Sequence, residues 1–279
     1  MIRRTVPQKT ISKETKLSGV GLHTGEHVNI TFKPAPADTG LVFVREDIKG
    51  ENLINAHIKY ISNTDRGTNL DNGSFRIHTS EHVLAAITGL EIDNCYICLD
   101  GAEVPIMDGS SKFFINALEE AKIVEQNVLR EEFFASEPIT YECEDSGSKI
   151  SILPDDDYKV NTIVDYKTKV LGEQEASINH ISEFKEEISS ARTFSFLHEL
   201  ETLLENGLIK GGDLNNAIVY VDKPLADSNM DILKKAFNKD SISVTPNGNL
   251  DNLDLHYPNE AARHKLLDVI GDLALIGMK

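Results

Sequence analysis

The chain has 279 residues, enough for one large domain or for two domains of about 130 to 150 residues each. Hydrophobic residues make up 40% of the chain and charged residues 26%, a balance that argues against a disordered or fibrous protein. Twenty-eight lysines and arginines against 45 aspartates and glutamates give a formal net charge of −17, which disfavours binding to nucleic acid or to an anionic membrane.

The N-terminal stretch is basic but lacks the apolar segment of a signal peptide, and no run of about 18 apolar residues occurs. We therefore expect a soluble, cytoplasmic protein with no integral membrane segment. The three cysteines do not make a disulfide framework. Cys95 and Cys98 lie in a predicted strand, where a spacing of three points the two thiols to opposite faces, so we expect core thiols. A metal site would then use nitrogen and oxygen ligands.

The first half of the chain begins with strands and then alternates helix, strand and helix. The predicted elements are strands at 28–34, 41–46 and 94–100 and helices at 80–90 and 111–124. The second of these helices is amphipathic, with Phe113, Ala117 and Ala121 or Val124 facing inward. The charged residues 125–138 are predicted to form a linker.

The second half of the chain repeats this order of events. The predicted elements are strands at 138–143, 148–154, 158–166 and 216–222, a helix across 181–207, and a last helix from about residue 259. The matching order predicts an α+β fold with two domains of related design, residues 1–126 and 127–279. The polar segments 167–182 and 222–257 are expected to be surface loops.

The last predicted helix carries one polar stripe on an otherwise apolar surface. His264, Asp268 and Asp272 are spaced four residues apart, so they share an arc of roughly 80°. In one interpretation these groups satisfy one another or are solvated at the edge of a cleft. In the other, His264 and Asp268 bind zinc at about 2.0 to 2.2 Å and Asp272 orients a catalytic group.

A second candidate lies where the helix at 80–90 begins. Glu81 directly precedes His82, with Thr79 or Ser80 as the expected N-cap. If His82 binds a metal ion, Glu81 can act as the base that deprotonates the attacking water. The alternative is structural, because carboxylates are common in the first turn of a helix for electrostatic reasons.

The same segment also fits a rival pattern. His78, Glu81 and His82 spell H-x-x-E-H, the motif of the inverted zinc peptidases. That assignment needs a helix that begins before His78, whereas Thr79 and Ser80 resemble a cap that leaves His78 outside.

Five strings of residues, in chain order, resemble one enzyme family. They are SGVGLHTG (18–25), SEHVLAAITGLEIDN (80–94), PIMDGS (105–110), SARTFSFL (190–197) and RHKLLDVIGDLAL (263–275). Together they resemble the UDP-3-O-acyl-N-acetylglucosamine deacetylases, zinc hydrolases of lipid A biosynthesis in Gram-negative bacteria. The resemblance implies two α+β domains, each a β-sheet with two helices packed on it, an active site between the layers and a hydrophobic passage for the substrate's acyl chain.

The resemblance also implies roles for individual residues. The family's zinc ligands fall on His82, His264 and Asp268, which leaves a fourth position for water. Glu81 matches the general base, and Thr193 matches the hydroxyl that stabilises the tetrahedral oxyanion.

Other matching positions concern substrate binding. Phe194 would pack against the sugar, and Lys265 matches the residue that meets the polar or phosphate groups of the substrate. His23 and Leu22 match the family's N-terminal loop near the site. The residues that would line the acyl passage are Leu200, Ile209, Gly212, Leu214 and Val219.

The sequence departs from the family pattern in two places. No residue matches the general-acid histidine of a Gly-His pair that the pattern places after the last helix, where it is held by the carboxylate matching Asp272. We therefore expect zinc binding but poor amide hydrolysis, in a chain that is truncated or is the front part of a fusion with an acyl-carrier-protein dehydratase. Leu153 stands near a position where some members place a lysine.

The sequence as a whole predicts a cytoplasmic, Zn²⁺-dependent amide hydrolase that removes the acetyl group from UDP-3-O-acyl-N-acetylglucosamine. The inverted zinc peptidase built on His78, Glu81 and His82 is one alternative, and a catalytically silent substrate-binding scaffold is another. The preferred acyl length, the oligomeric state and the choice between zinc and iron stay open, because a His2Asp site with water tolerates both metals.

Overall fold

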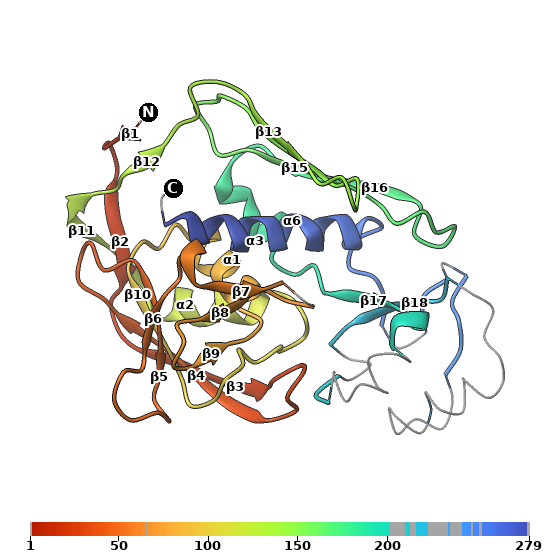
Figure 1. Ribbon diagram of the computed structural model, residues 1–279, viewed down its shortest axis with the longest axis horizontal. Helices are drawn as coiled ribbons and strands as arrows, with labels where there is room; N and C mark the ends of the chain where they lie inside the picture. Colours follow the sequence, from red (N-terminus) through yellow and green to blue (C-terminus); the bar gives the residue numbers. More distant parts are fainter. Residues whose placement is uncertain are drawn as a thin grey trace.

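The computed structural model describes residues 2–64, 66–200, 210–212, 216–222, 234, 242–246, 248–250 and 253–277. Its helices and strands confirm the predicted α+β class. The largest sheet has five strands in the order β3-β4-β10-β5-β6 (Figure 1). Its strands are β3 (Thr15–Val20), β4 (His27–Pro34), β5 (Leu41–Arg45), β6 (Leu53–Asn55) and β10 (Cys95–Leu99).

Two helices of the first half join this sheet in one hydrophobic core. Along β4 the side chains alternate, so that Val28, Ile30 and Phe32 are buried while the residues between them are partly exposed. The ring of Phe32 meets the edge of Phe114 on α2 (Lys112–Glu120), with 6.3 Å between centroids. Helix α1 (Glu81–Gly89) packs on α2 and is buried along its whole length, so it lies inside the core rather than on its surface.

Short sheets complete the first half. Strand β2 (Pro7–Ile11) pairs with β11 (Ile123–Leu129), and β1 (Ile2–Arg3) pairs with β12 (Glu132–Phe133). A three-stranded sheet consists of β7 (Ile61–Asn63), β8 (Asn69–Asp71) and β9 (Arg76–Ile77), preceded by the 3-10 turn η1 (Ile58–Tyr60).

The second half begins with two hairpins. They are β13 (Ile139–Glu142) with β14 (Lys149–Ile152), and β15 (Val160–Asp165) with β16 (Glu173–Ile178). The 3-10 turn η2 (Ile181–Glu183) and helix α3 (Phe184–Glu187) follow, and β17 (Phe194–Phe196) pairs in parallel with β18 (Ile218–Tyr220). The described chain ends with α6 (Glu260–Leu273) and the 3-10 turn η3 (Ala274–Ile276).

Helix α6 packs against elements of both halves of the chain. It runs between α1 and the hairpin β15–β16 (Figure 1) and contacts both. Leu266, Leu267 and Ile270 are fully buried in the same cluster as Leu84 and Ile87 of α1. The polar stripe of α6 is therefore brought against the start of α1, although about 180 residues separate the two in sequence.

Four predictions about individual elements were wrong. The segment 167–182, expected to be a surface loop, contains the strand β16, in which Ala176 and Ile178 are buried. The helix expected across 181–207 is interrupted, because residues 194–196, which include the aromatic Phe194 and Phe196, form β17 and pair with β18.

In α2, Ala117 and Ala121 are buried as predicted, but the inward phenylalanine is Phe114 rather than Phe113, which is 40% exposed. The alternative inward residue Val124 is also 40% exposed. The expected linker at 125–138 instead includes part of β11 and all of β12, and Arg130 between them is buried.

Two further expectations concern the thiols and the membrane. Cys95 and Cys98 are free, buried thiols, as predicted. Among the described residues, no helix is both long and apolar enough to span a membrane. The division into domains at residues 126 and 127 stays a prediction.

Candidate metal centre and active site

The close crossing of α1 and α6 depends on a glycine. A Cβ atom added to Gly271 would overlap the carbonyl oxygen of Glu81. Without a side chain at this position, the two helices approach closely enough for residues of α6 to reach the first turn of α1. This contact is the reason that the stripe of His264 and Asp268 meets His82.

His82, His264 and Asp268 form one cluster. Their ligand atoms all lie within 4.8 Å of one another, and no other group of three such side chains occurs in the described part of the chain. Asp268 Oδ1 is 3.7 Å from His82 Nε2 and 3.5 Å from His264 Nε2. The two imidazole rings are nearly perpendicular, with centroids 5.0 Å apart. Both histidines are buried, at 4% and 2% exposure.

The surroundings keep both imidazoles neutral. Burial lowers the pKa of His82 to about 3, reinforced by the neighbouring His264, and burial lowers the pKa of His264 as well. His264 Nδ1 is 3.1 Å from the carbonyl oxygen of Ala191. Because a carbonyl only accepts, Nδ1 donates to it and the lone pair of Nε2 faces the cluster.

Asp268 supplies the negative charge. Burial acts to raise the pKa of its carboxyl, but His264 and the ammonium group of Lys265 outweigh burial and bring the pKa to about 2. Lys265 Nζ donates to Oδ2 at 2.7 Å. Oδ1 is buried and has no hydrogen-bond partner within the described structure.

This donor set fits a zinc ion. An unpartnered carboxylate oxygen and two neutral imidazole nitrogens are the ligands that Zn²⁺ prefers, and four ligands in a tetrahedral site lie about 3.3 Å apart. The two separations from Asp268 Oδ1, 3.7 and 3.5 Å, are slightly larger than this, and all three ligand atoms lie within 4.8 Å of one another. The unpartnered Oδ1 of Asp268 has a physical explanation if it is a metal ligand.

Glu81 lies beside the cluster and is held from the opposite side. The backbone N–H of Thr68 donates to Glu81 Oε2 at 2.9 Å, and Gly67 lies over the other carboxylate oxygen. Burial, with the charge of Asp268 added, raises the pKa of Glu81 to about 8. A carboxyl group with so high a pKa is able to accept and release a proton near neutral pH.

Thr68 also reaches the last residue of the stripe. Its hydroxyl donates to Asp272 Oδ1 at 2.6 Å. Asp272 as a residue is exposed, but its carboxyl group lies in a desolvated position, and this desolvation raises the pKa of Asp272 to about 6. Thr68 thus links Glu81 and Asp272. Sequence reasoning missed Thr68, because its role comes only from tertiary contacts.

A cavity of about 170 Å³ opens beside the cluster. Its lining residues are Arg66, Tyr166, Thr193, Phe194, Phe196, Glu199, His264 and Lys265. The ring of Phe194 meets His264 edge-on, with 6.4 Å between centroids. The cavity therefore joins the candidate metal ligands to an aromatic wall and two cationic side chains.

Comparison with known proteins identifies the family. A family profile described as UDP-3-O-acyl N-acetylglycosamine deacetylase matches residues 8–234 and 228–279. The chain belongs to this deacetylase family.

Similar proteins are of two kinds. The chain is 44% identical over 276 residues to a bifunctional enzyme LpxC/FabZ of Chlorobaculum tepidum, and 42% identical over 270 residues to one of Porphyromonas gingivalis. These alignments cover 98% and 97% of this chain but only 59% and 58% of the two relatives. The chain is also 38% identical to a UDP-3-O-acyl-N-acetylglucosamine deacetylase of Saccharophagus degradans, across 98% of this chain and 82% of that protein.

The family's expected site residues are brought together only in part. The three candidate ligands lie together, and Glu81 directly precedes His82. Thr193, Phe194 and Lys265 line the cavity that His264 also borders. The ammonium group of Lys265 is, however, engaged by Asp268. Among the described residues, the recorded side-chain hydrogen-bond partner of Asp272 is Thr68, not a histidine.

Where the structure describes them, the residues expected to line the acyl passage do not border the cavity beside the cluster. Leu200 and Val219 are buried and Gly212 is partly exposed, but none of the three lines the 170 Å³ cavity. Ile209 and Leu214 lie outside the described residues.

The rival motif fails on geometry. Helix α1 begins at Glu81, so His78 is not on the same helix as His82. His78 Nδ1 instead pairs with the Asn69 side chain at 2.9 Å.

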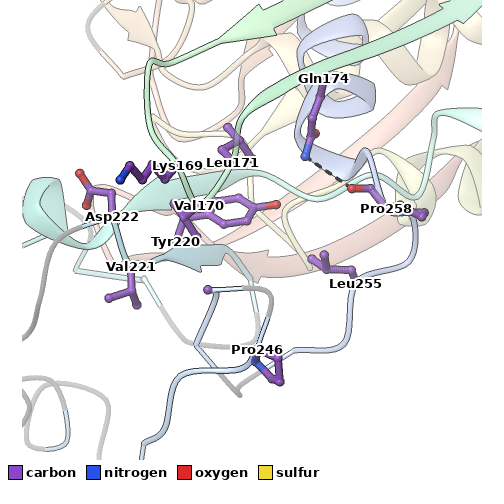
Figure 2. Close-up of a pocket in the computed structure, with 11 residues that line it drawn as sticks. Lys169, Val170, Leu171, Gln174, Tyr220, Val221, Asp222, Pro246, Leu255 and Pro258 are labelled. Carbon is purple, nitrogen blue, oxygen red and sulfur yellow. Dashed lines mark hydrogen bonds between the residues drawn. The ribbon is translucent and has the colours of Figure 1, made fainter.

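A larger cavity of about 640 Å³ is lined by none of His82, His264 and Asp268, and Figure 2 shows the side chains around it. Its lining residues are Lys169, Val170, Leu171, Gln174, Tyr220, Val221, Asp222, Pro246, Gly248, Leu255 and Pro258. Val219, the residue of β18 assigned to the acyl passage, is not among these lining residues. Because this cavity contains no member of the cluster, its greater size does not make it the catalytic site.

Proposed function

We propose that this chain carries the active site of a Zn²⁺-dependent amide hydrolase that removes the acetyl group from UDP-3-O-acyl-N-acetylglucosamine in lipid A biosynthesis. The observation that carries the proposal is the buried cluster of His82, His264 and Asp268 with Glu81 beside it. Membership of the deacetylase family supports the substrate. A fused dehydratase stays part of the proposal, supported by the bifunctional relatives, and the cytoplasmic location stays a prediction.

The metal would be held by the two imidazoles and the carboxylate of Asp268. When bound, Zn²⁺ supplies Lewis acidity to the acetyl carbonyl and to the attacking water. The ammonium group of Lys265 holds Oδ2 of Asp268, so that Oδ1 keeps its direction toward the histidines.

The chain's own side chains perform the proton and charge steps. Glu81, held by the Thr68 amide, accepts a proton from the water as its oxygen attacks the carbonyl carbon. The hydroxyl of Thr193 is assigned to the oxyanion, where a donor acts on charge that develops only in the transition state. The protonated Glu81 then returns this proton to the amide nitrogen as the C–N bond breaks, and acetate and a free amine are released.

Metal content tests the proposal and its rival together. We expect wild-type protein and His78→Ala to retain one zinc ion per chain after dialysis, and Asp268→Ala to retain less than a tenth of that. Loss of zinc from His78→Ala, with retention in Asp268→Ala, would favour the inverted peptidase instead.

Activity tests the reaction itself. The assay measures acetate released from UDP-3-O-acyl-N-acetylglucosamine by the wild-type protein and its variants. Glu81→Gln should keep its zinc while kcat falls by about 10² to 10⁴. A zinc-loaded wild-type protein that releases no acetate would support the silent scaffold and contradict the proposal.

A further inference from the structure

Glu103 is a fully buried carboxylate that the proposed reaction does not use. Its exposure is 0%, and within the described structure no lysine or arginine pairs with it. It lies between β10 and α2, where its backbone bridges to His78. A buried charge without a cation is stable only if hydrogen bonds replace its hydration.

Four donors from two other segments satisfy this carboxylate. The backbone N–H groups of His23 and Thr24 donate to it at 2.9 Å each. The hydroxyl of Thr24 donates at 2.8 Å and the hydroxyl of Thr79 at 3.1 Å. Gly21 allows this approach, because a Cβ atom there would lie 2.5 Å from Glu103 Oε2.

Thr79 is in a strained conformation. Its φ is +58°, a left-handed value that is unfavourable for a β-branched residue. Thr79 comes directly before the N-cap Ser80 and two residues before Glu81, so its backbone sets the direction in which α1 begins. The bond to Glu103 holds the residue in this conformation.

The loop at 21–25 leads to the site by a second route. His23 Nε2 lies 3.2 Å from the carbonyl oxygen of Arg66. The next residues of that segment, Gly67 and Thr68, cover and hydrogen-bond the carboxylate of Glu81. Thr79 therefore leads along the chain to Glu81, and the loop at 21–25 contacts the segment 66–68 that covers the carboxylate of Glu81.

We propose that Glu103 is a positioning residue, which fastens the loop at 21–25 to the start of α1 and so aligns Glu81 and His82. The kinetic consequence rests on the proposed function, whereas the structural consequence does not. Glu103 touches neither the candidate ligands nor the cavity, so it acts only through the segments that it holds.

Glu103→Gln tests this role with little change in shape. The amide has one acceptor oxygen instead of two, so the N–H of either His23 or Thr24 must face an NH2 group. Asp93→Asn is the matched control, because Asp93 is also a mostly buried carboxylate that accepts a backbone N–H, from Lys9, together with Arg130.

Hydrogen exchange gives the readout that does not depend on activity. In Glu103→Gln we expect the amides of residues 22–25, 66–68 and 80–83 to exchange at least tenfold faster, relative to those of β10 in the same variant. In Asp93→Asn, the exchange rates of the same amides relative to those of β10 should equal the wild-type values. Equal acceleration across the whole core in Glu103→Gln would overturn the proposal.

The kinetic constants kcat and KM for acetate release give the second readout. In Glu103→Gln, kcat should fall about tenfold while KM stays within twofold and zinc content is unchanged, and Asp93→Asn should keep its kcat. If Glu103→Gln does not fold, Thr79→Val decides, since it removes one donor and keeps the side-chain shape. Wild-type kcat and exchange in Thr79→Val would contradict the proposal. Absence of acetate release by the wild type would defeat the proposed function, while the exchange data would still decide the role of Glu103.

Discussion

Helix α6 and the outer faces of the hairpins belong to the same half of the chain but to different environments. Leu266, Leu267 and Ile270 of α6 have 0% exposure, because they pack into the core built mainly by the first half. On the hairpins, Tyr141, Ile150 and Ile163 are 68%, 60% and 62% exposed. The candidate metal centre therefore depends on the crossing of α1 and α6, and the outer hairpin faces contribute little to it.

The difference also explains where polar groups tolerate burial. Beside α6, each buried charge has specific partners, such as the Arg192 guanidinium on Glu260 at the first turn. Along the hairpins the charged pairs are open to water, for example Lys159 with Asp155. Interactions of the same chemical type should thus differ widely in their effect on stability.

The largest loss of stability from a single substitution is expected where α1 and α6 touch. Gly271→Val would place a branched side chain against the carbonyl oxygen of Glu81 and force α6 away from α1. We expect a loss of about 4 kcal/mol in the free energy of unfolding, at the upper end for single substitutions, together with loss of zinc. Urea unfolding and metal analysis measure both. Retention of stoichiometric zinc would show that the site tolerates a wider crossing.

Breaking a buried ion pair should cost a similar amount of stability. Arg192 and Glu260 have side-chain exposures of 5% and 0%, and the guanidinium also donates to the carbonyl of Asp254. Arg192→Met leaves the charge of Glu260 buried and unpaired, which costs about 3 to 5 kcal/mol. The matched change in the hairpin region, Lys159→Met, should leave the unfolding midpoint unchanged. Equal effects would mean that the two regions do not differ as described.

The sequence predicts each half of the metal cluster but not their meeting. The i,i+4 spacing of His264 and Asp268 follows from helix geometry, and the Glu81-His82 pair follows from the N-cap at Ser80. Nothing in either pattern indicates that α1 and α6 cross. Only the family resemblance predicted that the two motifs form one site. Gly271 permits the contact, but its sequence neighbourhood does not distinguish it from any other glycine in a helix.

The missed features depend on tertiary contacts. Thr68 and Glu103 act through hydrogen bonds to segments far away in sequence, and such bonds leave no periodic signal. Residues 194–196 were predicted as helix because helical sequence surrounds them, yet pairing with β18 decides their conformation. The inward face of α2 was displaced by one residue because Phe113 and Phe114 are adjacent and periodicity alone does not choose between them.

A partly exposed ion pair at the far end of α1 should have an intermediate effect that depends on pH. Although partial burial opposes the change, hydrogen bonds and charge from Lys9 and Arg130 lower the pKa of Glu91 from 4.5 to about 2. Because the pKa is depressed in the folded state, the stabilisation is present above pH 4.5 and is lost as pH falls toward 2. Allowing for solvent screening, we expect about 1 to 2 kcal/mol.

Urea unfolding of wild-type protein and Glu91→Gln at several pH values measures this contribution. The stability difference between the two should be largest at pH 7 and should shrink below pH 4.5. A difference that stays constant down to pH 3 would mean that the Glu91 charge does not cause it.

The smallest effect is expected on the open face of β15, where neighbouring residues provide an internal comparison. Ile163 points outward with 62% exposure, whereas Val164 points toward α6 with 8% exposure. Ile163→Ala should change the free energy of unfolding by less than about 0.5 kcal/mol. Val164→Ala should cost about 1 to 2 kcal/mol, although it removes fewer carbon atoms, because those atoms are packed in the core. A larger loss from Ile163→Ala than from Val164→Ala would show that the outer face is covered in solution, and the contrast between α6 and the hairpin faces would no longer hold.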